Sequence, residues 1–262
     1  MKFFFLKKKL KKYFKFILNK KNFKIKKIKN DIKKGIYFNS NIPEGYGIGS
    51  SGALVASIYN RYYCNKKIIN KDNFNKNNIL ELKKILSDME SFFHKKSSGL
   101  DPLVSFLDFP LLWNNKKKKI YKINLISEIS CFIINSGKKI LTSKMVNFFL
   151  NKIKNNKYFR NIFKNNFLEY TNNCIENYSK HKINDFFKNI KLLSLCTLQN
   201  FKNFIPNNIK DIWKEGILKN EFYIKLCGSG GGGYFILFTK KKYSFIKKKL
   251  KYFSPKKINF NI

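Results

Sequence analysis

The stretch 42–59, IPEGYGIGSSGALVASIY, decides how the rest of the chain is interpreted. Three glycines alternate after a proline, two serines follow, and the apolar run after them predicts a helix over 53–63. Glycine permits positive φ and lets backbone N–H groups come close to a ligand. A helix that begins directly afterwards turns its unpaired N–H groups and its positive dipole end to the same place. The stretch therefore predicts an anion cradle, most simply for phosphate, and the alternative is a tight turn capped by a serine.

Two common phosphate-binding motifs are absent from this stretch. A GxxxxGK(S/T) loop is excluded because Gly49 is followed by Ser50 and Ser51, and no lysine enters the loop. A GxGxxG loop is excluded because its third glycine would fall at Ser50. Any phosphate bound here would be held by a different kind of loop.

A second group of polar residues lies further along the chain. The apolar residues of segment 80–93 recur every three or four positions, which predicts a helix. Glu90 and His94 share one face of it, and the helix then breaks into the turn that ends at Asp101. Two carboxylates held by a helix end and a turn suit Mg²⁺ ligation and a polar contact to a substrate hydroxyl. An ordinary surface acid and a hydrogen-bonded histidine are the alternatives.

A second glycine-rich segment, KLCGSGGGGYFILF over 225–238, lies near the carboxyl end. Five glycines surround one serine, and an apolar strand follows at once. Glycine is costly in chain entropy, so we expect the backbone of this loop to approach something closely. A flexible linker is the alternative, but it conflicts with the strand that follows directly.

The composition indicates a folded protein with a large excess of lysine. Hydrophobic residues make up 44% and aromatic residues 17% of the 262 residues, which argues against disorder. The formal net charge of +40 alone points to nucleic acid or an anionic membrane. The lysines are spread everywhere, however, together with Asn, Ile, Phe and Tyr, the residues with A/T-rich codons. Base composition can therefore produce the charge without a selected partner, and a basic nucleic-acid-binding protein is the less favoured alternative.

The cysteines and the amino-terminal residues indicate the cellular compartment in which the protein is expected. Five scattered cysteines without a CxxC pair are typical of reduced thiols in a cytoplasmic protein. Segment 1–18 is basic and aromatic, but lysines interrupt each apolar run, so it has no signal-peptide core. No apolar run is long enough to span a bilayer. A basic amphipathic helix resting on a membrane is the alternative for this segment.

Other elements can be predicted more coarsely. We expect strands over 35–40 and 131–135, a helix ending near 155, a long helical region over 158–203, and a helix over 206–217 with a proline near its start. The lysine run 116–119 is interpreted as a boundary, which gives an amino-terminal lobe over 1–115 and a carboxy-terminal lobe over 116–262.

Three motifs together resemble the GHMP kinases, the small-molecule kinases that include galactokinase, homoserine kinase and mevalonate kinase. PEGYGIGSSGA is similar to the family loop P-x-x-x-G-(L/I)-G-S-S-(A/G). The stretch 90–101 resembles the mevalonate kinase segment E-x-x-x-H-G-x-x-S-G-(V/I)-D without a gap, although Lys95 replaces its glycine. KLCGSGGGG resembles the third motif, K-(L/I)-(T/C/S)-G-(A/S)-G-G-G-G.

This resemblance implies an α+β fold of two lobes with the active site between them. The amino-terminal lobe would be like domain 2 of ribosomal protein S5, and the carboxy-terminal lobe ferredoxin-like. It also implies ATP and Mg²⁺ as cofactors and a small-molecule alcohol as substrate, and it leaves a homodimer open. The residues implied to bind ATP are Pro43, Gly45, Gly47, Gly49, Ser50, Ser51, Gly52, Gly228, Ser229, Gly230, Gly231 and Gly232.

The resemblance also implies which residues hold the metal ion, contact the substrate and accept the proton of its hydroxyl group. Ser51 and Glu90 would hold Mg²⁺, and Asp101 would orient or deprotonate the acceptor hydroxyl. His94, Ser98 and Gly99 would contact the substrate. The Ser-Gly-Leu-Asp segment favours mevalonate and isoprenoid synthesis. Phosphomevalonate kinase, diphosphomevalonate decarboxylase and sugar kinases share the outer motifs and remain alternatives.

One family motif has no counterpart in the sequence. The family begins with a strand carrying P-G-(K/R)-x-x-(L/I)-x-G-E-H, whose lysine helps to polarise the reacting groups, and nothing in residues 1–34 matches it. Either the chain starts too late, or the first strand has been lost, or another lysine substitutes. A degenerate relative that keeps the fold and binds without turnover is therefore the alternative to a kinase.

Overall fold

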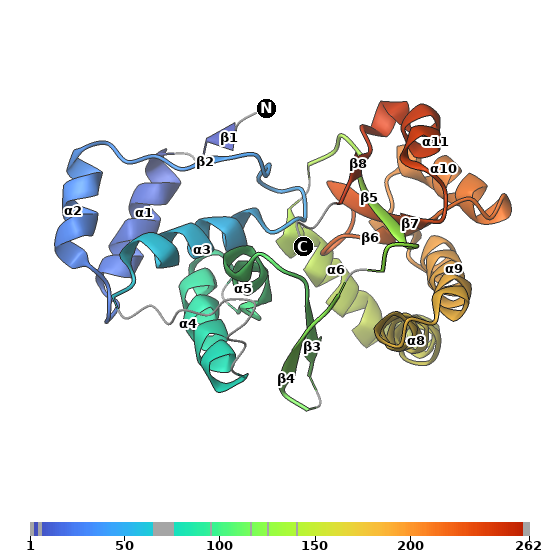
Figure 1. Ribbon diagram of the computed structural model, residues 1–262, viewed down its shortest axis with the longest axis horizontal. Coiled ribbons are helices and arrows are strands. Elements are labelled where there is room, and N and C mark those ends of the chain that lie inside the picture. Colours follow the sequence, from blue (N-terminus) through green and yellow to red (C-terminus); the bar gives the residue numbers. More distant parts are fainter. Residues whose placement is uncertain are drawn as a thin grey trace. The chain divides into compact units, whose positions relative to one another are not determined.

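The computed structural model describes residues 3–4, 7–64, 76–94, 96–115, 117–124, 126–139 and 141–258. It divides into two compact units. The amino-terminal unit contains residues 1–44 and 49–124, and the carboxy-terminal unit contains residues 45–48 and 125–262. Both units mix helices with antiparallel strands, which confirms the α+β class (Figure 1).

The amino-terminal unit is mainly helical. Its helices are α1 (Lys7–Leu18), α2 (Ile25–Lys33), α3 (Ser50–Tyr62), α4 (Lys76–His94) and α5 (Leu100–Leu107). Its strands form two antiparallel pairs, β1 (Phe3–Phe4) with β2 (Asn39–Ser40) and β3 (Leu111–Asn114) with β4 (Lys119–Lys122). The predicted helices over 53–63 and 80–93 are thus confirmed as α3 and α4. The end of the lysine run lies in and after the turn of the β3–β4 hairpin (Figure 1).

The apolar face of α1 is packed inside the amino-terminal unit. Leu10, Tyr13, Phe14 and Ile17 recur at helical spacing, and each is at most 4% exposed. They belong to one core cluster with apolar side chains of α2, α3, α4 and α5. Because the core already uses this face, α1 does not present these four side chains to a membrane surface.

The predicted strand over 35–40 is confirmed only at Asn39–Ser40. The residues before it end α2 instead: Gly35 takes φ +79°, its N–H donates to the Ile32 carbonyl, and the Ile36 N–H donates to the Asp31 carbonyl. This pair of bonds is the Schellman ending of a helix, for which glycine is preferred. The backbone groups of these residues are therefore used locally and not in a strand ladder.

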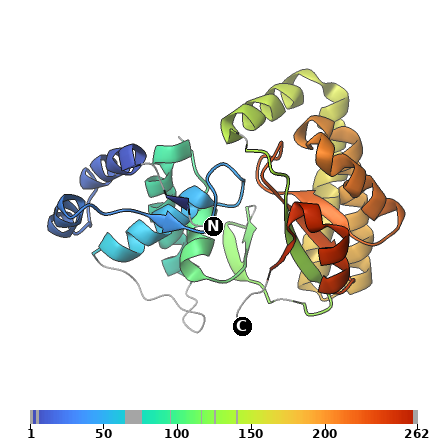
Figure 2. The ribbon, with the colours of Figure 1, turned by 90° about the horizontal axis from the view of Figure 1, so that it is seen from above.

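The carboxy-terminal unit is built on a four-stranded antiparallel sheet. Its strands are β5 (Ser130–Asn135), β6 (Tyr223–Leu226), β7 (Tyr234–Thr239) and β8 (Lys256–Lys257), in the order β6-β7-β5-β8. The helices are α6 (Thr142–Asn155), α7 (Lys157–Ile162), α8 (Leu168–Ser179), α9 (Ile183–Asn200), α10 (Asn207–Leu218) and α11 (Tyr243–Lys249). In Figure 2 the helices α8 and α9 lie together, and α9 and α10 pack on β6.

The long helical region predicted over 158–203 is interrupted. A π-helical segment, Phe163–Phe167, separates α7 from α8, and the chain turns between α8 and α9, where His181 takes φ +56°. The helix predicted over 206–217 is confirmed as α10, with Pro206 directly before it. The core of this unit includes Trp213, which is fully buried and donates its indole N–H to Ser194 Oγ at 2.7 Å.

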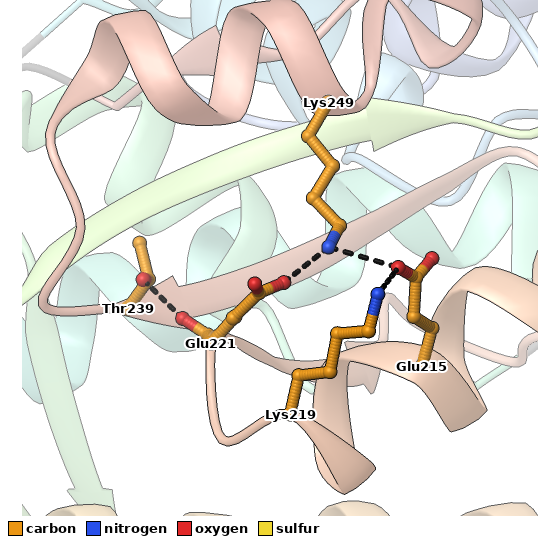
Figure 3. A network of polar contacts seen from close by, with 5 residues as sticks. All are labelled: Glu215, Lys219, Glu221, Thr239 and Lys249. Atoms are coloured by element: carbon orange, nitrogen blue, oxygen red, sulfur yellow. Dashed lines mark hydrogen bonds and ion pairs between the residues drawn. The ribbon is translucent and has the colours of Figure 1, made fainter.

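A cluster of charged side chains links α11, α10 and the turn before β6 (Figure 3). The Lys249 ammonium lies 2.9 Å from Glu215 Oε1 and also contacts Glu221, whose backbone carbonyl accepts a hydrogen bond from Thr239. Lys219, which is far more exposed, binds the same oxygen of Glu215. Burial alone lowers the pKa of Lys249, but the hydrogen bonds and charges of Glu221 and Glu215 outweigh it and raise the pKa.

We expect Lys249→Met to destabilise the carboxy-terminal unit. It removes a lysine that is 18% exposed and leaves Glu221, equally shielded, without its cation, so the loss should be about 1 kcal/mol. The control is Lys219→Met, which removes a solvated partner and should change stability by no more than ~0.5 kcal/mol. Urea unfolding of both variants measures the difference. Equal losses would show that the shielded contact contributes nothing.

Tyr13 of α1 carries a buried hydroxyl without a hydrogen-bond partner among the described residues. Burial raises the pKa of this phenol well above its usual range, and the charges of Glu90 and Asp88 add to the rise. An unpaired buried hydroxyl costs about 1–3 kcal/mol. We therefore expect Tyr13→Phe to raise the free energy of unfolding by about 1 kcal/mol.

The control for this substitution is Tyr62→Phe. Tyr62 is equally buried, but its hydroxyl donates to Asp31 Oδ2 at 2.7 Å, so its removal should lower stability by about 1 kcal/mol. In thermal or urea unfolding, we expect the free energy of unfolding to rise in Tyr13→Phe and to fall in Tyr62→Phe. A loss of stability in Tyr13→Phe would show that the hydroxyl has a partner, such as an ordered water.

Candidate active site

The start of α3 has the geometry of an anion cradle. Gly49 caps the helix with φ +76°, a conformation that favours glycine, and its carbonyl accepts the first helical bond from the Ala53 N–H at 2.9 Å. The N–H groups of the first turn have no partner within a helix, and glycine has no side chain to cap them. They remain directed outward at the positive end of the helix dipole. Binding of phosphate by Gly49, Ser50 and Ser51 stays a prediction, with this geometry in its favour.

A second helix start lies against the first. Gly99, with φ +71°, begins α5, and Asp101 lies in its first turn. A Cβ built on Gly52 would lie 2.8 Å from the backbone carbon of Asp101 and equally close to Pro102 N. Only glycine at position 52 therefore allows the two helix starts to pack at this distance. As a result, Asp101 Oδ2 lies 3.7 Å from the point where a Cβ on Gly49 would be.

The third part of the site is a hydroxyl between an acid and a histidine. Ser51 Oγ donates to Glu90 Oε1 at 3.1 Å and lies 3.0 Å from His94 Nε2. A serine has one proton to donate, and here Glu90 takes it, so Nε2 of His94 carries the proton that Ser51 accepts. Glu90 is only 4% exposed. Helices α3 and α4 thus bring together the two residues predicted as metal ligands.

The donor set suits a magnesium ion that takes most of its ligands from phosphate. Within the described ranges no three His, Cys, Asp or Glu side chains gather into a metal site made by protein alone. Ser51 and Glu90 instead offer one hydroxyl and one carboxylate at the end of α3 that would hold a phosphate. Magnesium in such sites keeps one or two protein ligands and takes the rest from phosphate and water. The residues present therefore fit Mg²⁺.

Sequence reasoning missed Ser97. Its hydroxyl donates to Glu90 Oε2 and accepts the Gly99 N–H at 2.9 Å, so it fixes the acid and the start of α5 at once. Ser98, predicted to contact substrate, is exposed, and its hydroxyl accepts the Leu100 N–H at 3.2 Å. The doubled serine before Gly99 was the available signal, because either residue could have met Glu90. Lys95, which replaces the family glycine, lies outside the described residues.

Asp101 is accessible to solvent, and its surroundings raise the pKa of its carboxyl group above the ordinary value. Desolvation by the neighbouring protein raises the pKa of this carboxyl, and the charge of His94 acts against the rise. The side chain is exposed by surface area, so we expect the rise to be modest. Asp101 is therefore a carboxylate with a raised pKa beside a helix start suited to phosphate, and it is a candidate proton acceptor.

The glycine-rich loop 227–233 of the carboxy-terminal unit packs against residues 45–48. The Tyr234 N–H donates to the Tyr46 carbonyl at 2.9 Å, and a Cβ on Gly233 would lie only 2.2 Å from the same oxygen. A Cβ on Gly47 would lie 3.1 Å from the Cys227 carbonyl oxygen. The close backbone approach expected from these glycines is therefore, in part, an approach to the chain itself.

The other predicted residues are placed as follows. Pro43 is buried, and Gly99 packs so tightly on α4 that a Cβ would lie 2.4 Å from the Lys83 carbonyl oxygen. The Gly231 N–H donates to the Phe204 carbonyl at 2.6 Å. The residues predicted to bind ATP from the second unit, Gly228, Ser229, Gly230, Gly231 and Gly232, all lie between β6 and β7. Nucleotide binding by them stays a prediction.

Comparison with known proteins gives a match for the amino-terminal domain and a shared fold. Residues 8–108 match the model of the GHMP kinases N terminal domain. A search of curated proteins found no match. None of the helices in the described part of the chain has the length and apolar character needed to cross a membrane.

Several solved structures share the fold. The mevalonate kinase of L. major in complex with R-mevalonate is 16% identical, with a TM-score of 0.61 over 84% of this chain and 68% of that one. A Listeria innocua protein is 14% identical, with a TM-score of 0.63 over 89% and 75%. Mevalonate kinase from methicillin-resistant Staphylococcus aureus is 15% identical, with a TM-score of 0.52 over 92% and 78%.

The matched residues 8–108 include the starts of α3 and α5 and the whole of α4, which carry Ser51, Asp101 and Glu90. The likeness to the solved structures extends beyond them to the carboxy-terminal unit, since it covers more than four fifths of the chain. Residues 8–108 thus match the GHMP kinases N terminal domain, and the chain shares its fold with the solved structures over most of its length.

Proposed function

We propose that the chain is an ATP-dependent kinase that phosphorylates the hydroxyl group of a small molecule, with mevalonate as the first candidate acceptor. One observation carries the proposal: the Asp101 carboxylate lies beside the capping residue of α3, where Ser51 and the buried Glu90 also meet. A proton acceptor and a phosphate-binding helix start are thus adjacent, which is what transfer of a phosphoryl group to an alcohol requires.

Each side chain has a distinct task in this proposal. The first-turn N–H groups of α3 bind phosphate oxygens, and Asp101 accepts the proton of the acceptor hydroxyl. His94 donates to Ser51 and so fixes the direction of its hydroxyl. Ser51 and Glu90 would hold Mg²⁺, whose positive charge would neutralise part of the phosphate charge. Ser97 holds Glu90 in place from the other side.

The choice of acceptor rests on sequence and on structural neighbours. The stretch 90–101 resembles the mevalonate kinase segment, and two of the similar solved structures are mevalonate kinases, one of them in complex with R-mevalonate. Phosphomevalonate, diphosphomevalonate and sugars are the other acceptors that the family motifs allow. The reaction would serve isoprenoid synthesis in the cytoplasm, where the five cysteines, all free thiols, stay reduced.

The test is ADP release from Mg-ATP by the purified chain, with each acceptor supplied separately. We expect release that depends on mevalonate, with a phosphate ester as product, detectable by ³¹P NMR. Release of ADP with another acceptor would support the proposal that the chain is a kinase, but with a substrate other than mevalonate. Binding of ATP without release in the presence of any acceptor would instead support the non-catalytic relative.

A further inference from the structure

A cavity of about 490 Å³ lies in the helical part of the carboxy-terminal unit, between α9 and the helices that precede it. Helix α9 lines it with Leu192, Leu195, Cys196 and Gln199, which have the spacing of one helix face. The volume is within the range of small-molecule sites in proteins. All lining residues belong to the carboxy-terminal unit, so the cavity is separate from the site at the start of α3.

The other wall of the cavity is a stripe of residues spaced four apart, Tyr158, Ile162, Asn166 and Tyr170. In a regular α-helix four positions advance by about 400°, so such a stripe would drift by about 120° over its three steps. The π-helical segment Phe163–Phe167 lies in the middle of the stripe, and its i to i+5 hydrogen bonds place more residues in one turn. This segment takes up much of the drift, and the four residues therefore line the same cavity. Such π-helical segments are rare and are frequent at functional sites.

The lining of the cavity is neutral, although the chain is strongly basic. The sequence has 55 lysines and arginines, yet none of the described residues that line the cavity carries a charge. The polar groups are instead the amides of Asn166, Gln199 and Asn200 and the phenols of Tyr158 and Tyr170. A charged ligand would lose its hydration here without gaining an opposite charge. The lining therefore favours a neutral ligand.

Several of these polar groups can form further hydrogen bonds. Asn166 Nδ2 donates to the Tyr170 hydroxyl at 3.3 Å, which leaves the phenol proton and Asn166 Oδ1 without a partner among the residues that the structure describes. Asn200 Nδ2 donates to the Cys196 carbonyl at 3.0 Å, and within the same described ranges the Gln199 amide has no partner. A side-chain amide presents donors and an acceptor next to each other. This arrangement is complementary to the edge of a cyclic amide, which also presents a donor beside an acceptor.

We propose that this cavity binds a neutral, planar heterocycle with a cyclic amide edge, of the size of a pyrimidine nucleoside. The amides of Asn166 and Gln199 bind the polar edge of the ligand, and the aromatic and leucine side chains of the lining contact its apolar faces. The site is an additional one, and it does not depend on the proposed kinase activity.

The probe is uridine, added to the ¹⁵N-labelled full chain and followed by NMR of the side-chain amide groups. We expect uridine to shift the signals of Asn166 and Gln199, with a dissociation constant of about 1 mM or lower. In 3-methyluridine a methyl group replaces the ring N–H, so we expect it to bind about 5-fold more weakly, or worse. Uridine 5′-monophosphate should bind no more tightly than uridine, because the lining has no cation for its phosphate.

Matched variants test whether the lining amides bind the probe. Asn166→Ala should raise the dissociation constant for uridine by about 5-fold, as for the loss of one hydrogen bond. The control is Asn165→Ala, which removes the neighbouring exposed amide of the same π-helical segment and should leave uridine binding unchanged. Gln199→Leu is the second test: it changes an exposed side chain that has no hydrogen bond to lose, so the variant should fold normally and bind uridine about 5-fold more weakly.

Three results would overturn the inference. The first is that uridine leaves the amide signals of Asn166 and Gln199 unchanged. The second is that Asn166→Ala and Gln199→Leu bind uridine as tightly as the unmodified chain does. The third is tighter binding of uridine 5′-monophosphate than of uridine, because a phosphate contact outside this cavity would then determine the affinity. None of these results affects the kinase proposal, which is tested by ADP release.

Discussion

Asp101→Asn is expected to lower acceptor-dependent ADP release by about 10²–10⁴-fold, the usual contribution of a general base. The amide has nearly the same shape as the carboxylate but cannot accept the proton of the acceptor hydroxyl. Its neighbours, Gly49 and Gly52, do not require the charge for their packing. ATP affinity should therefore change little, and the loss should appear mainly in kcat. Steady-state rates with both substrates varied measure the two effects separately.

The pH profile adds a second criterion to this substitution. Desolvation raises the pKa of Asp101, and a base acts only when deprotonated, so activity should fall as pH decreases through that raised pKa. The variant should lack this acidic limb in kcat. The control is Asp108→Asn at the other end of α5, where the exposed residue has φ +56°, a conformation that asparagine tolerates. If Asp101→Asn releases ADP as fast as the unmodified chain, Asp101 is not the base.

Gly52→Ala is expected to destabilise the amino-terminal unit by about 1–3 kcal/mol and to remove most of the activity. The added methyl group would lie 2.8 Å from backbone atoms of Asp101 and Pro102, which cannot turn away as a flexible side chain could. The start of α5 would have to shift, and Asp101 would shift with it. Glycine to alanine inside a helix normally stabilises by about 1 kcal/mol, so the expected sign is opposite to that of helix propensity.

Urea unfolding, followed by rate measurements on the folded variant, checks this expectation. Ser57→Ala on the same helix is the control: its exposed hydroxyl bonds only the Ala53 carbonyl one turn earlier, so its loss should have little effect. A Gly52→Ala protein with unchanged or greater stability would show that α3 and α5 are not packed at the described distance.

The site could be predicted from sequence where local pattern and chemistry coincide. The alternating glycines followed by serines predicted the start of α3, and the helical period over 80–93 predicted α4 with Glu90 near its end. The helix α5 was not predicted, because Ser97 to Pro102 has the composition of a turn. Its proline lies in the first turn of the helix, where it costs no hydrogen bond.

Other features depend on contacts that sequence patterns do not contain. Nothing in the local sequence distinguishes Gly52, needed for helix packing, from a glycine needed for ligand access. The β3–β4 hairpin was not predicted, because its strands are short and because Lys117 and Lys118 of its turn belong to a lysine run that resembles a boundary. Segment 35–38 has strand composition, yet the Schellman ending of α2 uses the N–H groups of Gly35 and Ile36. In each case a distant partner, or the end of a preceding element, determines the outcome.

The exchange of residues 45–48 into the carboxy-terminal unit affects the order in which the protein can fold during synthesis. The ribosome makes the chain from its amino terminus, and early segments begin to fold before later ones exist. Most partners of α3 are already present once residue 124 has been made. Tyr46, in contrast, has to wait for Tyr234, whose N–H fixes its carbonyl. The loop 45–48 therefore reaches its final form late, when nearly the whole polypeptide has been translated, and a chain stalled before β7 would carry α3, α4 and α5 without this completed loop.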